Sequence, residues 1–162
     1  MIRTRRIRSQ DGGGYQPIRD ASDPALVPTP GLPAGHHKVT IETVKLLLEN
    51  LPPTLQSERE TLAKCLEAMN RVMPLRAVYL FGSHARGDAR ADSDVDLCIV
   101  ADGAERQLEA ARQFREAMWD VWPRPSFSLV PICPTRLAEK EARRDHFFFT
   151  VLNEGVLLAT EN

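Results

Sequence analysis

One stretch of sequence decides the fold of this chain: Leu80-Phe81-Gly82-Ser83-His84-Ala85-Arg86-Gly87-Asp88-Ala89-Arg90-Ala91-Asp92-Ser93-Asp94-Val95-Asp96-Leu97-Cys98-Ile99-Val100. It starts at the end of an apolar run over 77–81, which is rich in strand-forming residues and stops at a glycine. A second apolar run over 95–101 predicts another strand. The stretch therefore joins two strands through a Gly-Ser turn and a polar loop.

The Gly-Ser turn has the chemistry of a phosphate contact. Gly82 has no Cβ, so its backbone can approach a ligand closely, and Ser83 offers a hydroxyl and an N–H where we expect a helix to begin. Phosphate oxygens are bound at such places. A Gly-Ser pair by itself indicates no more than a turn.

Two carboxylates stand at the head of the second strand. Asp94 and Asp96 are two residues apart, and the two-residue period of a strand directs both side chains to one face, about 6–7 Å apart at Cα. Two such carboxylates repel each other unless a cation lies between them, and oxygen ligands of this kind favour magnesium or manganese. An isolated Asp-x-Asp is more often a pair of solvated side chains.

The order of these features resembles a known signature. Gly82-Ser83, ten intervening residues and Asp94-x-Asp96 are similar to the motif of minimal nucleotidyltransferases (MNT) in the DNA polymerase beta superfamily. Arg86-Gly87 and Ser93 also match that family's common form. The resemblance covers about residues 76–158. It implies an α+β polymerase-beta-like nucleotidyltransferase fold, in which a small mixed sheet is flanked by helices.

The resemblance also implies roles for individual residues. Gly82 and Ser83 would cradle the phosphates of a nucleoside triphosphate, ATP by resemblance, while Asp94 and Asp96 would hold Mg²⁺ or Mn²⁺. Arg86 has two interpretations that stay open: neutralisation of triphosphate charge, or pairing with a neighbouring carboxylate or a helix end.

The chain departs from the family at a third carboxylate. The family supplies it from a later strand, and the best-matching position here carries Ser128, within the apolar run over 126–132, where we expect a strand over 127–132. In the family this acid helps to hold the catalytic metal and to accept the proton of the attacking hydroxyl. A neutral serine hydroxyl is a weak ligand, so we expect nucleotide and metal binding to tolerate this change better than turnover does.

Two function classes follow. The first is a metal-dependent nucleotidyltransferase that transfers a nucleoside monophosphate, AMP by resemblance, to a hydroxyl of a protein partner or another acceptor. The second is a catalytically weakened nucleotide-binding module, antitoxin-like, that acts by contact with a HEPN-type toxin protein. Retention of Gly82, Ser83, Asp94 and Asp96 favours the first class, and Ser128 favours the second.

Composition indicates one compact domain and an appendage. The chain has 162 residues, 43% of them hydrophobic, with a net charge of −1 that argues against a general nucleic-acid coat. Residues 1–38, rich in Pro, Gly and Arg, are expected to be a flexible arm, and 39–162 a single nucleotidyltransferase domain. No apolar run reaches the roughly 20 residues of a membrane span and no secretory signal is evident, which predicts a cytoplasmic protein.

The remaining elements are predicted from local patterns. Thr40 is expected to cap a helix over 41–51, and Ser57-x-x-Glu60 to form a capping box for a second helix. Further helices are expected over 105–119, 135–144 and 146–153, with Gly155 as a C-cap. The apolar positions expected on the inner faces of the second and third helices are Leu62, Cys65, Leu66, Met69, Met73, Leu108, Ala111, Phe114 and Met118.

Several single residues receive more modest interpretations. His84 and Arg90 are interpreted as exposed loop residues. Trp119, Trp122 and the run 147–149 are interpreted as core or as a contact between subunits, which leaves a homo-oligomer open. The cysteines, odd in number and widely spaced, are expected to be buried free thiols: Cys65, Cys98 and Cys133.

Overall fold

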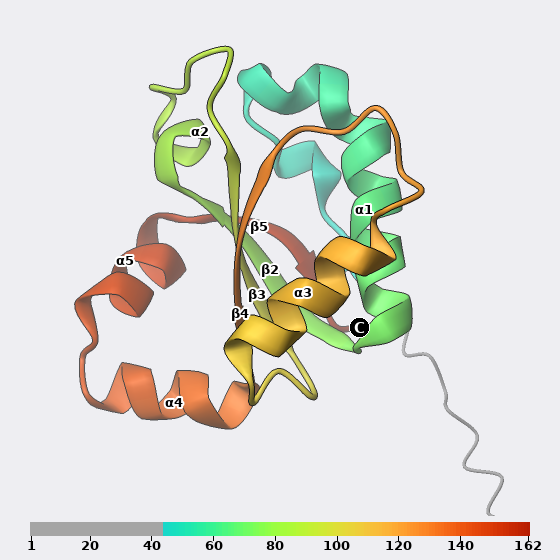
Figure 1. Ribbon diagram of the computed structural model, residues 1–162. Helices are drawn as coiled ribbons and strands as arrows, with labels where there is room; N and C mark the ends of the chain where they lie inside the picture. Colours follow the sequence, from blue (N-terminus) through green and yellow to red (C-terminus); the bar gives the residue numbers. More distant parts are fainter. Residues whose placement is uncertain (1–43) are drawn as a thin grey trace, which may run out of the picture. The chain divides into compact units, whose positions relative to one another are not determined.

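The computed structural model describes residues 44–162, so the predicted arm over 1–38 and the expected cap at Thr40 lie outside the described residues. A five-stranded sheet of order β1-β5-β2-β3-β4 forms its centre (Figure 1). The β3–β4 pair is parallel and the other pairs are antiparallel, which confirms the mixed sheet. The strands are β1 (Lys45–Leu46), β2 (Leu75–Phe81), β3 (Val95–Ala101), β4 (Phe127–Ile132) and β5 (Val156–Thr160).

Helices cover both faces of this sheet (Figure 1). Two 3-10 helices, η1 (Leu48–Asn50) and η2 (Pro53–Glu58), precede the α-helices. The α-helices are α1 (Arg59–Val72), α2 (Gly82–Arg86), α3 (Gln107–Ala117), α4 (Pro134–Ala142) and α5 (His146–Glu154). The strands and helices expected from residue 77 onward are therefore all present, with ends that differ by a few residues.

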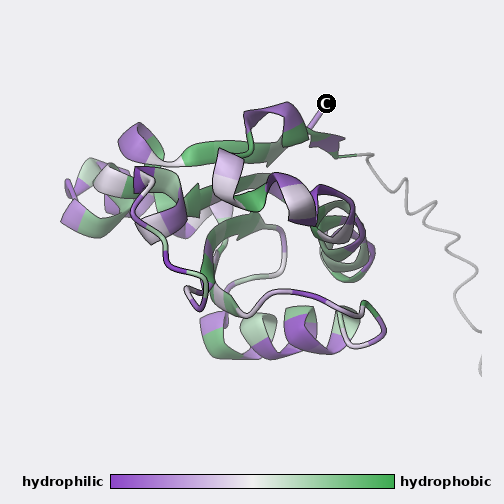
Figure 2. Cartoon of the chain, turned by 90° about the horizontal axis from the view of Figure 1, so that it is seen from above, coloured by the Kyte–Doolittle hydropathy of each residue, from purple (hydrophilic) through white to green (hydrophobic). Residues whose placement is uncertain are grey.

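The two faces of the sheet belong to different apolar clusters. Along β3, Val95, Leu97 and Ile99 join the large core with α1 and α3, whereas Cys98 and Val100 join a smaller cluster with residues of α4 and α5. This alternation follows from the two-residue period of a strand. Figure 2 shows the matching pattern on the helices, which carry hydrophobic and hydrophilic residues on different sides. Asp96 shares the face of the smaller cluster.

The start of the described chain differs from the expected helix over 41–51. Residues Lys45 and Leu46 form β1, paired with Thr160 and Ala159 of β5, and η1 follows. The apolar spacing is real, because Val44, Leu48 and Leu51 are buried. A strand forms instead because the edge of β5 would otherwise be unpaired. Its backbone offers hydrogen-bond partners to Lys45 and Leu46, although the two segments are more than a hundred residues apart in the sequence.

The predicted capping box of α1 is also wrong. The residue before the helix is Glu58, and no side chain caps the helix. Because η2 runs directly into α1, Ser57 already lies in helical backbone and cannot act as the N-cap. The predicted inner face of α1 is confirmed, since its apolar stripe is buried: Leu62, Cys65, Leu66 and Met69, with Met73 just beyond the helix.

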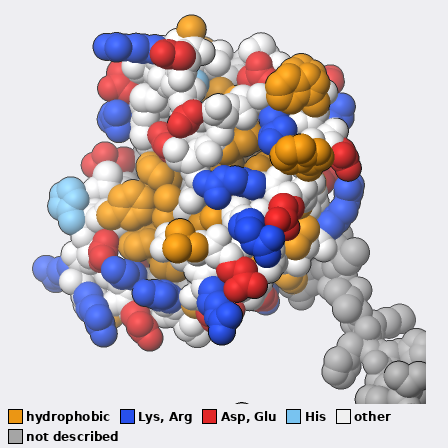
Figure 3. All heavy atoms as spheres, in the orientation of Figure 1, with side chains coloured by type: hydrophobic (Ala, Val, Ile, Leu, Met, Phe, Trp, Pro, Cys, Tyr) orange, Lys and Arg blue, Asp and Glu red, His pale blue; other side chains and the backbone are white. Residues whose placement is uncertain are grey.

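Some large apolar residues lie on the surface. Leu108, expected to face inward, is 87% exposed in the first turn of α3, while Ala111, Phe114 and Met118 are buried as predicted. Trp119 and Trp122 are 77% and 80% exposed, so their interpretation as core is wrong. Figure 3 shows hydrophobic side chains reaching the surface among the charged ones. A contact between subunits stays a prediction.

Local details of the core agree with the sequence. The three cysteines are free and buried, as predicted. Burial raises the pKa of the Cys98 thiol to about 12 and that of Cys65 to about 11. Gly155 is the C-cap of α5, but in extended backbone; a Cβ there would lie 2.3 Å from the carbonyl oxygen of Val151. No helix within residues 44–162 is long and apolar enough to cross a membrane.

Candidate functional site

The turn between β2 and α2 brings the glycine of the motif against a carboxylate. Gly82 has φ +70°, a left-handed conformation that favours glycine. A Cβ on Gly82 would lie 2.1 Å from Oδ2 of Asp96. A side chain at position 82 would therefore have to displace this carboxylate. Residues 82–83, called the phosphate turn below, therefore lie in contact with Asp96.

Asp96 lies between two neighbouring strands. Its register partner on β2 is Phe81, the residue directly before the phosphate turn, and on β4 it is Ser128. Side chains at paired positions of adjacent strands share a face of the sheet. Asp96 is partly buried, whereas Asp94, which directly precedes β3, is exposed. The structure thus places Asp96, Ser128 and the phosphate turn together at one end of the sheet.

The loop between α2 and β3 is held by hydrogen bonds between residues close in the sequence. Gly87, with φ +81°, ends α2, and the N–H of Asp88 donates to the carbonyl oxygen of Ser83 at 3.0 Å. Ser93 closes a turn, because its Oγ accepts from the N–H of Arg90 at 2.8 Å and its own N–H donates to the Arg90 carbonyl oxygen at 3.0 Å. The serine of the motif therefore shapes the backbone that leads into Asp94.

His84 is buried, contrary to the expectation of an exposed loop residue. Only 6% of it is accessible, and its ring nitrogens lie 3.1 Å from Oγ1 of Thr54 and 3.3 Å from the carbonyl oxygen of Ser93. A five-residue helix carries too little sequence to show which of its sides faces the protein. Arg90 is exposed, as expected.

The structure shows one of the two interpretations of Arg86, its pairing with a neighbouring carboxylate. Its Nε lies 3.4 Å from Oδ2 of Asp88, and both side chains are more than half exposed, so this ion pair contributes little to stability. The same side chain lines a cavity next to the phosphate turn. A weak, solvated pair leaves the guanidinium available to an anion.

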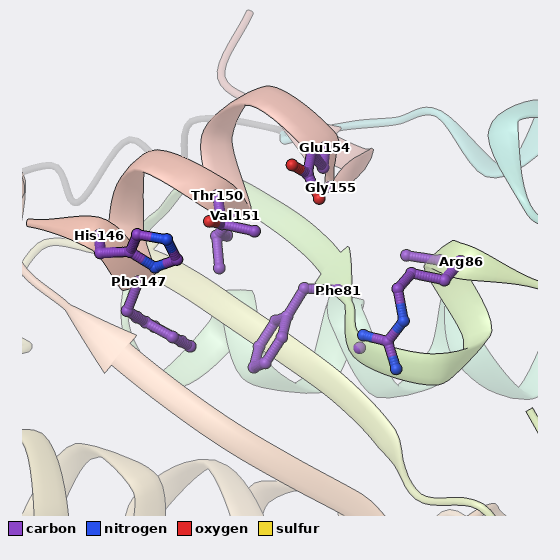
Figure 4. A pocket seen from close by; sticks show the side chains of 10 residues that line it. Phe81, Arg86, His146, Phe147, Thr150, Val151, Glu154 and Gly155 are labelled. Atoms are coloured by element: carbon purple, nitrogen blue, oxygen red, sulfur yellow. The ribbon is translucent and has the colours of Figure 1, made fainter. Parts of the chain in front are cut away.

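This cavity, of about 350 Å³, lies between α2 and α5. Figure 4 shows the Phe81 ring between Phe147 and Arg86, with Thr150 and Glu154 above it. The two rings meet edge to face, with centroids 5.3 Å apart and planes at 89°. Sequence reasoning did not find this cavity, because its walls come from segments about sixty residues apart; the aromatic run 147–149 was the one signal.

The carboxylates provide the donors that a hard cation requires. Asp94 and Asp96 offer only oxygen ligands, which fits magnesium or manganese. Within residues 44–162 no group of three or more His, Cys, Asp or Glu side chains could hold a metal ion by itself. A cation held by Asp94 and Asp96 would therefore need further oxygen ligands from outside this set of side chains.

The fold and this arrangement define a class: small α+β domains in which a Gly-Ser turn meets strand-borne aspartates. The model of the nucleotidyltransferase domain family matches residues 60–146, more than half of the chain, so the chain belongs to that family. A solved structure of a candidate nucleotidyltransferase from Sulfolobus solfataricus is similar at 21% identity, covering 64% of this chain and 81% of that chain with a TM-score of 0.43. No curated protein matches.

Proposed function

We propose that the chain binds a nucleoside triphosphate together with Mg²⁺ or Mn²⁺ and transfers a nucleoside monophosphate, AMP, to a hydroxyl of a protein partner or another acceptor. The contact between Gly82 and Asp96 carries this proposal. The backbone of Gly82, which a phosphate can approach closely, therefore lies next to the Asp96 carboxylate, which can bind a cation. Membership of the nucleotidyltransferase domain family supports the same chemistry.

Each residue of the motif has a role in this proposal. Gly82 and Ser83 contact the phosphates, and Asp94 and Asp96 hold the cation. When bound, the cation neutralises phosphate charge and makes the phosphorus more open to attack. Arg86 adds an exposed positive charge near the phosphate turn, and Asp88 competes with the phosphates for it.

The cavity between α2 and α5 is the proposed place of the nucleoside. It adjoins Gly82, so a nucleotide whose phosphates lie on the turn can extend into it. Phe81 and Phe147 offer aromatic surface to a base, while Thr150 and Glu154 offer polar groups that could select among bases.

The transfer itself exchanges one phosphorus–oxygen bond for another. The acceptor oxygen forms a bond to the α-phosphorus, the bond between that phosphorus and the oxygen bridging to the β-phosphate breaks, and pyrophosphate leaves. The proton of the acceptor hydroxyl must pass to a base. Ser128 is a poor base for this step, and within residues 44–162 no third acid joins the pair.

That deficiency favours a second candidate function. In this second function, the domain still binds a nucleotide and a cation. It regulates a HEPN-type toxin protein by direct contact and transfers no nucleoside monophosphate. The observation that supports it is Ser128, which stands opposite Asp96 where a third carboxylate would complete the site.

Purified full-length protein incubated with Mg²⁺ and ATP labelled on the α-phosphate tests both candidates, with co-expressed neighbouring-gene products as acceptors. Covalent labelling of an acceptor with release of pyrophosphate supports transfer. Calorimetric ATP binding without labelling supports the contact function. Absence of Mg²⁺-dependent ATP binding would contradict both candidates.

A further inference from the structure

Among residues 44–162, His84 is the one polar side chain that is buried. It is the third residue of α2 and directly follows the phosphate turn. A buried polar ring is costly unless its nitrogens are hydrogen-bonded, and both nitrogens of His84 have partners. These partners lie in two separate segments, η2 and the loop that leads to Asp94.

The partners determine which nitrogen carries the proton. The carbonyl oxygen of Ser93 can only accept, so Nε2 donates to it across 3.3 Å. Nδ1 then accepts from the hydroxyl of Thr54 across 3.1 Å. A ring that carries its proton at Nε2 thus satisfies both bonds, and the Ser93 carbonyl selects this tautomer, because the Thr54 hydroxyl can either donate or accept.

The bond to Ser93 is placed where it can control Asp94. The loop is anchored at its start by the N–H of Asp88 on Ser83, and at its end by the N–H of Val95 on Ser126. His84 adds an anchor between these two, on the residue directly before Asp94. Asp94 itself is exposed and makes no hydrogen bond or ion pair among the described residues.

From this geometry we infer that His84 is a positioning residue, which fixes the loop at Ser93 and thereby holds Asp94 where it can share a cation with Asp96. This inference rests on the proposed function. Its physical reason is that two carboxylates repel each other, so a loop free to move would carry Asp94 away from Asp96. Residues that orient metal ligands from behind typically change metal affinity or activity by about 10–100-fold when they are removed.

The main variant is His84→Phe, which keeps a ring but removes both nitrogens. We expect Mn²⁺ binding in the presence of ATP, measured by electron paramagnetic resonance, to weaken about 10–100-fold. Backbone amides of residues 88–94 should exchange with deuterium faster than in the wild type. His84→Gln keeps an amide donor that can reach Ser93, and should recover a large part of both effects.

Two further variants separate positioning from simple destabilisation. Leu62→Ala removes a buried side chain of α1, so it should lower the melting temperature while leaving Mn²⁺ affinity and loop exchange unchanged. Thr54→Val removes only the hydroxyl that orients His84, at an exposed residue, and should weaken Mn²⁺ binding a few-fold in a folded protein. Thr54→Val keeps the test decisive if His84→Phe does not fold.

Wild-type Mn²⁺ affinity and loop exchange in both His84→Phe and Thr54→Val would overturn the inference. An equal loss of Mn²⁺ affinity in Leu62→Ala would overturn it as well, because the effect would then be general destabilisation. If the wild type binds no Mn²⁺ with ATP, the proposed function fails; exchange over residues 88–94 in the two variants then still decides whether His84 holds this loop.

Discussion

Asp96 on β3 and Ser128 on β4 are register partners in the parallel pair, so their side chains lie on the same face of the sheet. Neighbouring strands are about 4.8 Å apart, which is close enough for two side chains to contact one cation. The position where the family resemblance implies a third carboxylate is thus adjacent to Asp96 in space, and it carries a neutral hydroxyl.

Ser128→Asp tests the consequence of that hydroxyl. The wild type should transfer nucleotide weakly or not at all. The added carboxylate should raise the transfer rate by at least about tenfold, because it supplies a cation ligand and a proton acceptor. Transfer of label from the α-phosphate of ATP to the acceptor measures the rate, and Ser128→Asn is the control of equal size without charge. Strong wild-type transfer that Ser128→Asp does not increase would contradict this account.

The double substitution Asp94→Asn with Asp96→Asn removes the charges that would hold the cation. Calorimetry should show loss of Mg²⁺-dependent ATP binding, with the far-ultraviolet circular dichroism unchanged. The control is Asp92→Asn, which removes a charge from the exposed loop just before the site. Unchanged affinity in the double variant would exclude both residues from the site.

Gly82→Ala and Gly87→Ala form a matched pair. Both glycines have positive φ, +70° and +81°, so alanine should cost about 1–2 kcal/mol at either position. Only at Gly82 does the new Cβ collide with Asp96, whereas at Gly87 nothing lies within 4 Å. Gly82→Ala should therefore also abolish nucleotide binding, measured by calorimetry, and Gly87→Ala should keep it. Equal binding in the two variants would show that the contact with Asp96 is unimportant.

Asp145, the N-cap of α5, gives a prediction about pH. The hydrogen bond from Nζ of Lys140, at 2.8 Å, and that from the N–H of Phe148 hold the pKa of Asp145 below its ordinary value of 3.8. The charged form therefore stabilises the fold above that value, and this contribution is lost as pH falls through the lowered pKa. At pH 7 the wild type should have a higher melting temperature than Asp145→Asn. This difference should disappear as the pH falls below the lowered pKa of Asp145. A difference independent of pH would contradict this.

The cysteines should be unreactive in the folded protein. Burial and a pKa raised to about 12 for Cys98 and about 11 for Cys65 leave almost no thiolate at pH 8. Ellman's reagent should therefore modify these thiols only after denaturation, when all three cysteines of the chain react. Rapid labelling of the folded protein would show that the core opens locally.

Local sequence patterns were sufficient for the strands and most of the helices. The strand over 95–101 and that over 127–132 lie where their apolar runs predicted them, and Gly82 ends the strand before it, as expected. These features depend on residues a few positions apart, whose preferences act before any distant contact forms. The spacing of Gly82, Asp94 and Asp96 likewise indicated the family that residues 60–146 match.

Contacts between distant segments decided the rest. Lys45 and Leu46 became a strand because β5 pairs with them, and His84 became buried because η2 and Ser93 meet over it. The cavity beside Gly82 exists only because α5 packs near α2. No local pattern encodes these results. The hydrogen-bond partners of the Lys45–Leu46 backbone and of the His84 ring come from distant segments, and only the folded chain brings these segments together. The sequence by itself thus determined the strands and the motif, and the tertiary structure decided what surrounds the motif.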